Sequence, residues 1–485
     1  MNVSFSDFFK VPAHAVEKYG AFNISLLADL PLFVDPFLLF NSKKPAYRKL
    51  HDEMIRYLRF LRDKSSGANL DPQLIGAWYL FPEVCQNWLG FSKAGNKGRG
   101  LGRIFAAALH QNLGALFRDF GSEKVTKGSH LEKLCLIRDG VGKDSISDFT
   151  NNLIHRFLLE YTQEFAIRHI APELRKTVAV QKVQFNYDTE TWEIATFDLP
   201  WLEGDHILLT PRDILTRDET WINKNDLVKD FESIPTAISN EALRAQVSNY
   251  FRKVLPKNPD RDEEREAVTR TIMEFPALID YYIKYKEDHG TQAETISTEK
   301  VTLSRQLYLQ QFKELVDLLR QQTAFYSSSG VSYVEAKERV AFLKDVIENK
   351  GGHRIFYIKG KPIEREEDLH ILYRMTWYAS ESDVTREAND GRGPVDFKVS
   401  KGSKDKTLVE FKLAKNTQLE RNLQKQADIY QKASDAQVTI KVIIYFSASE
   451  RARVENILSK LKLTGHTNIV IIDARRDNKP SGSKA

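Results

Sequence analysis

Apolar and polar positions divide the chain into a helical first part, a helical middle and a C-terminal part that alternates as strands do. In the first part, apolar residues recur three and four positions apart, as at Tyr57, Leu58 and Leu61 and again through residues 153–165. That spacing puts one apolar stripe on a helix. The pattern therefore predicts mostly helix up to about residue 175.

Residues 178–188 and 191–198 alternate instead and flank a polar turn, which predicts a β-hairpin. Residues 207–209 predict another short strand, because a Thr-Pro pair follows and ends it. We therefore expect residues 1–223 to form an α+β region with much helix. Its expected role is target recognition or regulation.

The middle of the chain, residues 224–349, predicts a helical connector. Residues 225–288 have helical apolar spacing and many charges. Residues 290–297 are polar and predict a linker. Residues 302–319 and 332–349 predict two more helices.

Two short segments near the C-terminus alternate almost throughout, as half-buried strands do. Their apolar positions are Val395, Phe397, Val399, Val409, Phe411 and Leu413. Asp396, Glu410 and Lys412 occupy polar positions between them. The turn-like residues 401–405 separate the segments, so the pattern predicts a hairpin.

The register of this hairpin decides whether its charged residues can act together. A hairpin centred on Ser403 pairs residues whose numbers add to 806, and Asp396 and Glu410 satisfy that sum. Opposed residues share a face, with Cβ atoms about 4.5–5.5 Å apart. Two such carboxylates can chelate a divalent cation, and Lys412 lies on the same face. A slip of one residue would turn one carboxylate into the core.

The spacing leaves two interpretations open. Asp396, Glu410 and Lys412 can form a metal-dependent hydrolytic site, in which lysine orients water or stabilises transition-state charge. They can equally be ordinary charged residues on the solvent face of a hairpin. Opposed like charges are destabilising without a cation, which favours a functional reason for their placement.

The order Pro394-Val-Asp396 followed by Glu410-Phe-Lys412 resembles the PD-(D/E)XK nuclease superfamily. One residue separates the proline from the aspartate, a variation that the superfamily tolerates. The resemblance covers about residues 350–475 and implies a restriction-endonuclease-like α/β core, with helices around a mixed sheet. We place this nuclease domain at residues 350–485.

The resemblance also implies an element order of helix, three-stranded meander, helix and strand. Residues 364–378 are the expected first helix, residues 384–389 the first strand and residues 416–433 the helix after the motif. Residues 441–446 and 468–473 are the expected later strands.

Further site residues follow from the same resemblance. A glutamate on the first helix is expected near the metal, with Glu367 preferred over Glu366. Gln426 is expected to join Asp396, Glu410 and Lys412 in catalysis, although it could instead pack helix against sheet. The metal ligands are expected to be Glu367, Asp396 and Glu410, with Mg²⁺ or Mn²⁺ as cofactor. The expected nucleic-acid contacts are Arg392, Lys398, Lys415 and Tyr430.

Charge and composition agree with a polyanionic partner. The net charge is +7 from residue 351 onward (25 basic against 18 acidic residues) and −2 before it (46 against 48). Two cysteines exclude a disulfide framework and a cysteine-rich metal site, and they favour a reducing cytoplasm. We expect no signal peptide, because the first residues lack a basic segment followed by a long apolar one. We also expect no membrane span, because charged residues and prolines interrupt the apolar residues 22–40.

Three weaker candidates have plainer explanations. The Gly-rich basic residues 95–102 could bind phosphate or simply connect elements. Asp144 and Asp148 could form a second acidic site with Asp213 and Asp218, but helix capping and local pairing with arginines are the more common roles. No P-loop, zinc-protease or dinucleotide-binding motif is present.

The sequence therefore predicts a Mg²⁺-dependent DNA endonuclease of restriction or anti-phage defence. Cutting both strands would need two sites, which favours a homodimer or a partner protein. An RNase with the same site, or a non-catalytic nucleic-acid-binding protein that keeps only the fold, are the alternatives.

Overall fold

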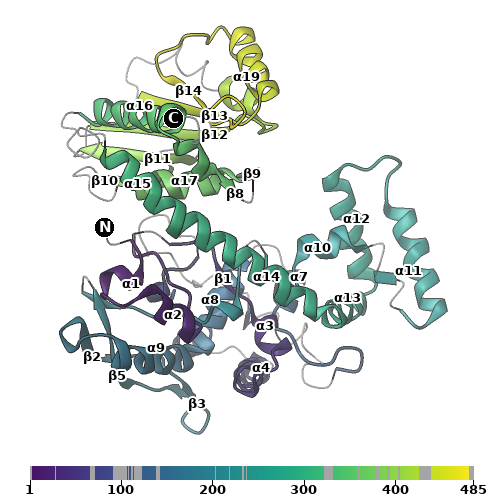
Figure 1. Cartoon of the computed structure of the whole chain (residues 1–485). Coiled ribbons are helices and arrows are strands. Elements are labelled where there is room, and N and C mark those ends of the chain that lie inside the picture. Colours follow the sequence, from purple (N-terminus) through teal and green to yellow (C-terminus); the bar gives the residue numbers. More distant parts are fainter. Residues whose placement is uncertain are drawn as a thin grey trace.

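The computed structural model describes most of the chain. The described residues are 3–27, 29–65, 71–90, 106, 109, 110, 113, 123–137, 143–202, 204–217, 219–231, 234, 235, 238–321, 331–358, 360–377, 383–389, 394–401, 405–424 and 438–479. Within these, only the backbone is described for residues 261, 262, 367, 374, 375, 383–389, 394–396 and 401. The fold is mostly helical α+β, with a mixed sheet in its C-terminal region (Figure 1).

The N-terminal region packs helices around short strands. Its α-helices are α1 (Phe5–Phe8), α2 (Ala13–Tyr19), α3 (Pro36–Asn41), α4 (Pro45–Ser65), α5 (Pro72–Trp78), α7 (Lys133–Ile137), α8 (Lys143–Leu153) and α9 (His155–His169). Its strands are β1 (Phe33–Val34), β2 (Arg175–Val180), β3 (Phe185–Asn186), β4 (Thr191–Trp192), β5 (Ala195–Leu202), β6 (Asp205–His206) and β7 (Leu215–Thr216). Tyr57, Leu58 and Leu61 are buried on α4, which confirms the predicted apolar stripe.

The predicted hairpin is confirmed, whereas the predicted strand after it is wrong. β2 pairs antiparallel with β5, and β3 pairs antiparallel with β4 at the tip. The next strand, β6, ends before residues 207–209. The N–H of Leu208 bonds the carbonyl of Gln86, and the N–H of Leu209 bonds the hydroxyl of Thr162. These two donors are satisfied by a loop and a helix instead of a neighbouring strand.

The middle region is helical, as predicted, but it contains no linker at residues 290–297. Its helices are α10 (Lys224–Lys229), α11 (Glu241–Val254), α12 (Arg261–Glu274), α13 (Leu278–Asp288), α14 (Gly290–Arg305), a π-helical segment η5 (Gln306–Gln311) and α15 (Phe312–Arg320). Residues 290–297 form the start of α14, because Ala293 and Ser297 are buried against the N-terminal region. A Cβ at Gly290 would lie too close to the Asn41 side-chain oxygen, so the Asn41 side chain would have to shift to admit a larger residue.

The C-terminal region is a five-stranded sheet with helices on both faces. Its elements are α16 (Ser332–Asn349), β8 (Tyr357–Ile358), β9 (Lys361–Pro362), α17 (Glu366–Met375), β10 (Asp383–Asn389), β11 (Pro394–Lys401), β12 (Asp405–Leu413), β13 (Val438–Tyr445), α19 (Ala448–Lys460) and β14 (Ile469–Asp473). The strand order is β10-β11-β12-β13-β14. The first three strands form an antiparallel meander, and β13 and β14 add in parallel.

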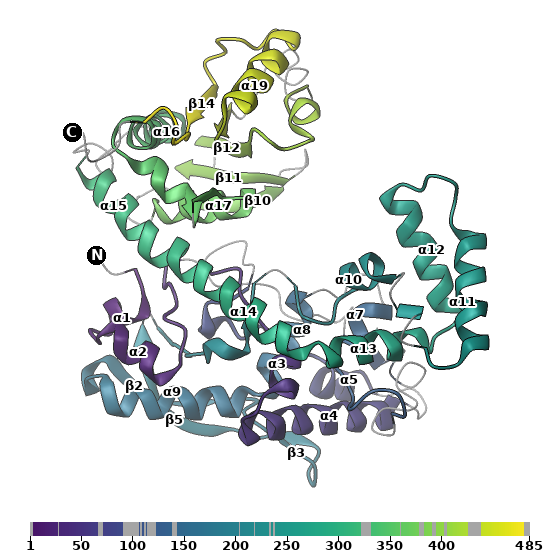
Figure 2. The ribbon, with the colours of Figure 1, turned by 45° about the vertical axis from the view of Figure 1, so that its right-hand side comes forward.

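Opposite faces of this sheet belong to two hydrophobic cores. Val409, Phe411 and Val442 belong to the large core that also includes apolar residues of α16 and α17. Ile443 and Tyr445 belong to a smaller core with α19. Figure 2 shows α16 and α17 on one side of the strands and α19 on the other. The helix α16, which the sequence placed in the connector, is therefore part of this packing unit.

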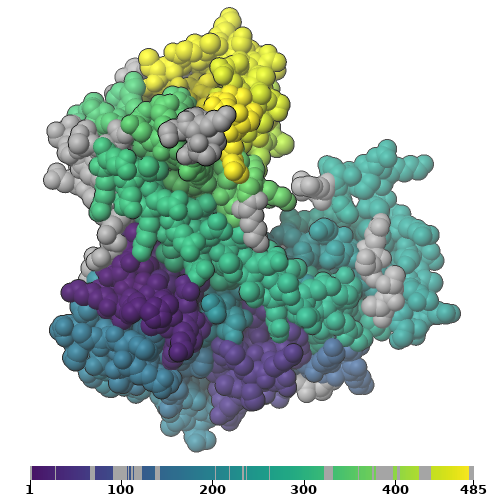
Figure 3. Space-filling model, in the orientation of Figure 1, coloured from purple at the N-terminus to yellow at the C-terminus, as the bar shows by residue number. Residues whose placement is uncertain are grey.

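The three parts of the chain are joined by a long helix and a buried ion pair. α14, η5 and α15 run from the N-terminal region up to the sheet (Figures 1 and 2). Arg217, just after β7, bonds Asp368 on α17, and Tyr308 of η5 donates to the same carboxylate at 2.6 Å. In Figure 3, α11 and α12 project from the body, with open space between them and the upper lobe. Among the described residues, no helix is long and apolar enough to cross a membrane.

Candidate active site

The predicted hairpin register is confirmed where the ladder is described. Five pairs, from Lys401 opposite Asp405 to Phe397 opposite Val409, follow the same sum of residue numbers. β11 continues through Asp396 and β12 through Glu410. Continuing the same register by one residue would pair the backbone of Asp396 with that of Glu410.

The alternation along β12 separates charged from apolar side chains. Val409, Phe411 and Leu413 are buried, whereas Glu410 and Lys412 are half-buried on the other face. Aromatic and β-branched residues suit a strand that is packed on one side, which explains why this segment is extended. Tyr373 of α17 lies 4.3 Å from Phe411 between ring centroids, so the helix is packed against the strand next to the charged residues.

Lys412 contacts the start of α17. Its Nζ lies 3.1 Å from Oε2 of Glu366, the first residue of α17. The other oxygen of Glu366 accepts hydrogen bonds from the Leu413 N–H at 3.2 Å and the Asn416 amide at 2.6 Å. These bonds hold the start of α17 at the end of β12. Of the two glutamates that the sequence offered here, Glu366 has a described contact with Lys412, whereas the side chain of Glu367 lies outside the described residues.

A second lysine joins the site from the neighbouring strand. β13 pairs in parallel with β12 and sets Lys441 directly beside Glu410. The Lys441 Nζ lies 2.9 Å from Glu410 Oε2 and donates to the Asn422 carbonyl at 3.2 Å. Sequence reasoning missed this residue, although a single lysine within the apolar strand of residues 438–445 was a usable indication. A buried charge is costly without a partner, so it marks a constrained position.

The charges of the site are nearly balanced. Glu366 and Glu410 are each paired with a lysine, and their side chains are 20% and 17% exposed. The sequence predicts Asp396 as a third carboxylate of this site. Carboxylate oxygens are the ligands that Mg²⁺ prefers, so this donor set fits the expected cation. Among the residues that the structure describes, no three His, Cys, Asp or Glu side chains form a metal site, but the Asp396 and Glu367 side chains are not among them.

The remaining predicted site residues fall into two groups. Gln426, Tyr430 and Arg392 lie outside the described residues. Lys398 is half-buried on β11, on the face that Asp396 shares by alternation. Lys415 is exposed just beyond β12, and its Nζ lies 3.4 Å from the Ile363 carbonyl. Both lysines are therefore near the hairpin.

The weaker candidates do not form a second acidic site with one another in the described part. Asp213 bonds Lys44 and Tyr47, and Arg217 pairs with Asp368. The Gly-rich residues 95–102 and Asp218 lie outside the described residues.

Asp148 has a more unusual environment than a capping residue. Burial, together with the nearby carboxylates of Asp144 and Glu83, raises the pKa of Asp148 to about 8. The neighbouring Ser147 hydroxyl accepts the Val34 N–H at 2.9 Å and so ties α8 to β1.

Two family models match this chain. Residues 10–223 match one described as a domain of unknown function (DUF8370), and residues 332–448 match another described in the same way (DUF8371). The second match begins with the first residue of α16 and includes Asp396, Glu410, Lys412 and Lys441. No curated protein matches the chain. No solved structure matches it either.

Proposed function

We propose that the chain is a Mg²⁺-dependent nuclease whose C-terminal sheet is a restriction-endonuclease-like core. The observation that supports this most is the hairpin register from Phe397–Val409 to Lys401–Asp405, which is the register that the proposed pairing of Asp396 with Glu410 requires. The order of α17, β10, β11, β12 and β13, with β13 parallel to β12, agrees with the order that the resemblance implies. Mn²⁺ could replace Mg²⁺ with the same ligands.

The proposed chemistry is hydrolysis of a phosphodiester bond. A bound Mg²⁺ would neutralise the phosphate and lower the pKa of a water molecule. Asp396 and Glu410 would hold the cation, and a glutamate at the start of α17 would assist. Lys412 would orient the attacking water or stabilise the charge that develops on the phosphate. Its ion pair with Glu366 keeps the ammonium in place before substrate arrives.

The contacts at the start of α17 change which glutamate we propose as the assisting one. Glu366 touches Lys412, the Leu413 backbone and Asn416, so it is our preferred assisting glutamate in place of Glu367. Lys441 is an added member of the site. Its ammonium neutralises Glu410 in the absence of a cation and thereby offsets the repulsion between opposed carboxylates.

DNA is the proposed substrate, and restriction or anti-phage defence is the proposed setting. The basic surplus of the C-terminal part favours a polyanion, and Lys398 and Lys415 would contact its phosphates. Cys85 and Cys135 are both free thiols, which suits the reducing cytoplasm. Double-strand cleavage would require a homodimer or a partner that supplies the second site.

A nuclease assay tests the proposal directly. Purified protein is incubated with plasmid DNA, linear single-stranded DNA and RNA, with Mg²⁺ or with EDTA. We expect cleavage of DNA that EDTA abolishes and that Asp396→Ala and Lys412→Ala each reduce by about 100-fold or more. Lys406→Ala is the matched control, because Lys406 lies on the same strand but near the turn.

Other outcomes would lead to the alternatives. Cleavage of RNA alone would make the protein an RNase with the same site. Cleavage that persists in both variants would refute the site assignment. Binding of nucleic acid without cleavage of any substrate would instead support a non-catalytic role of the fold.

A further inference from the structure

A short hairpin leads into the candidate active site. β8 and β9 pair antiparallel, and α17 begins four residues after β9 ends. Figure 1 shows β8 and β9 beside α17. The Nζ of Lys415, just beyond β12, lies 3.4 Å from the carbonyl oxygen of Ile363, just beyond β9. This contact holds the hairpin next to the end of the strand that bears Glu410 and Lys412.

Two short segments carry much of the basic surplus of the C-terminal part. Residues 351–365, which include the hairpin, contain four basic residues and one acidic residue. Residues 473–479 contain three basic residues and two acidic ones. Together the segments supply +4 of the net charge of +7 that the chain carries from residue 351 onward. A concentration of positive charge on one surface is the electrostatic signature of a polyanionic partner.

The structure brings these two segments together at the hairpin. The Tyr357 hydroxyl of β8 donates a hydrogen bond to the Ala474 carbonyl at 3.0 Å. The guanidinium of Arg476 lies 5.3 Å from the centre of the Tyr357 ring, which is a cation–π distance. Its Nη1 lies 3.8 Å from the position that a Cβ on Gly360 would occupy. Arg476 therefore lies over the turn between β8 and β9.

Three cations near this turn are exposed and lack an acidic partner. They are Arg354, Lys361 and Arg476, and none of them forms an ion pair with another residue that the structure describes. We name these three residues the basic hairpin surface. Burial lowers the pKa of the neighbouring His353, and the charges of three cations lower it further, namely Lys479, Arg354 and Arg476. The cations of both segments therefore act on one place.

The acidic residues of the second segment are paired with other cations. Asp473 lies 3.2 Å from the guanidinium of Arg475 and 3.8 Å from the Nζ of Lys479. Asp477 lies 3.9 Å from Arg475. In the first segment Glu364 is exposed, but it is a single carboxylate. The basic hairpin surface thus keeps a surplus of positive charge, which attracts an anion that lies across it.

The position of this surface beside the candidate active site indicates which polyanion it fits. A DNA backbone carries a phosphate at every nucleotide, so a strand bound at the site extends past the residues around it. The hairpin is held beside Lys415 and leads directly into α17, so such a strand would cross its cations. This continuity with the site favours DNA over an acidic protein.

We propose that the basic hairpin surface binds the phosphate backbone of duplex DNA beside the scissile phosphate and so holds the substrate at the nuclease site. The inference rests on the proposed nuclease function, from which it takes its substrate. Arg354, Lys361 and Arg476 each contact one phosphate, and such contacts position a duplex without reading its sequence.

Binding at several salt concentrations tests the surface without cleavage. A fluorescent DNA duplex is titrated with the full chain in EDTA. Arg354→Gln, Lys361→Gln and Arg476→Gln should each reduce the slope of log binding constant against log salt concentration by about 0.9, and the triple variant by about 2.7. An unchanged slope in the triple variant, or no binding of the duplex by the unaltered protein, overturns the proposal. Tighter binding of an RNA duplex of the same sequence overturns the choice of DNA.

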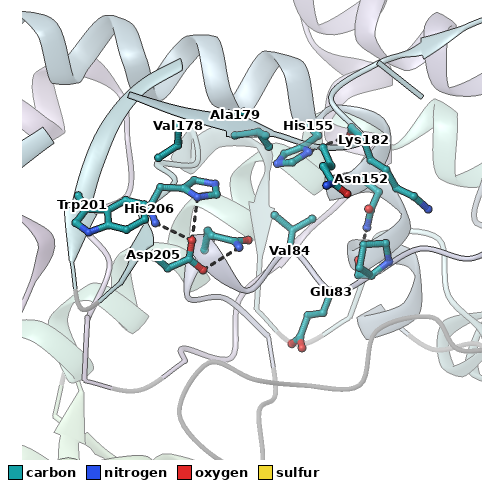
Figure 4. Close-up of a pocket in the computed structure, with 14 residues that line it drawn as sticks. Glu83, Val84, Asn152, His155, Val178, Ala179, Lys182, Trp201, Asp205 and His206 are labelled. Carbon is teal, nitrogen blue, oxygen red and sulfur yellow. Dashed lines mark hydrogen bonds and ion pairs between the residues drawn. The ribbon is translucent and has the colours of Figure 1, made fainter. Parts of the chain in front are cut away.

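Lys176→Gln is the matched control. Lys176 is exposed on β2 and lies 4.2 Å from the ring centre of Trp201, much as Arg476 lies over Tyr357. Trp201 lines a cavity of the N-terminal region (Figure 4), and β2 lies far from the C-terminal sheet (Figure 1). The salt slope should therefore be unchanged in Lys176→Gln, and an equal fall there would overturn the proposal. Thermal unfolding identifies a variant that does not fold, and the remaining variants then decide.

Cleavage kinetics distinguish this inference from the nuclease proposal. In the triple variant KM for the duplex should rise with little change in kcat, because contacts away from the scissile bond stabilise the bound substrate and the transition state alike. If the unaltered protein cuts DNA and the triple variant keeps its salt slope, the surface is refuted and the nuclease proposal stands. If the triple variant loses its slope although the unaltered protein cuts nothing, the surface is supported and the nuclease proposal fails.

Discussion

Replacing Arg217 with alanine should loosen the contact between the N-terminal region and α17. The guanidinium of Arg217 bonds Asp368, and the two side chains are only 8% and 5% exposed. Removing one partner of a buried ion pair costs about 3–5 kcal/mol, because the other charge stays buried. Tyr308 still donates to Asp368 at 2.6 Å in the variant, so we expect a value near the lower end, about 3 kcal/mol.

Hydrogen exchange followed by mass spectrometry measures the stability of α17 itself. If amides of α17 exchange through local opening, a loss of about 3 kcal/mol accelerates their exchange about 100-fold. Exchange in α9, which lies away from this contact, serves as the internal reference. Since Glu366 lies on the same helix, two residues before Asp368, DNA cleavage should fall together with the protection of α17.

A double variant distinguishes two causes of faster exchange in α17, namely an unpaired buried charge and the loss of a contact. Arg217→Met with Asp368→Leu removes both charges and replaces them with apolar groups, which is often close to neutral for stability. We therefore expect α17 to exchange much more slowly in the double variant than in Arg217→Ala. Equal acceleration in both variants, or none in Arg217→Ala, would refute the reasoning.

Three further predictions concern the site and the N-terminal region. Lys441→Met removes the cation 2.9 Å from Glu410, so the Mg²⁺ concentration for half-maximal cleavage should fall about fivefold, corresponding to about 1 kcal/mol of repulsion. Lys415→Ala should reduce the slope of log binding constant against log salt concentration for duplex DNA by about 0.9, if Lys415 neutralises one phosphate. Burial raises the pKa of Asp148 to about 8, so its protonated form stabilises the fold at low pH and that contribution is lost as the pH rises toward 8. Asp148→Asn stays neutral, so its gain in thermal midpoint over the unaltered protein should grow between pH 4 and pH 8.

The first two of these predictions have a control variant, and the third has an outcome that would contradict it. Lys460→Met removes an exposed lysine paired with Glu420 and should leave the Mg²⁺ requirement unchanged. Lys257→Ala, on an exposed part of the middle region, should leave the salt slope unchanged. A difference between Asp148→Asn and the unaltered protein that is the same at every pH would contradict the assigned pKa shift.

The sequence by itself determined the strands of the candidate site and their register. Alternation has a period of two residues, so burial of one face specifies which residues of β11 and β12 lie on the other. The short turn between Lys401 and Asp405 then leaves one register that keeps both apolar sets in the core. Residues 438–445 alternate only weakly, because β13 is covered on both faces and both of its faces therefore carry apolar residues.

Tertiary structure decided the features that depend on partners distant in the chain. Glu366 reaches Lys412 only because α17 is packed against β12. Residues 290–297 are polar enough for a linker, yet packing against the N-terminal region makes them helical. Lys441 reaches Glu410 only because a parallel strand brings them side by side. Local spacing carries no information on such contacts, because they depend on how separate elements are packed together.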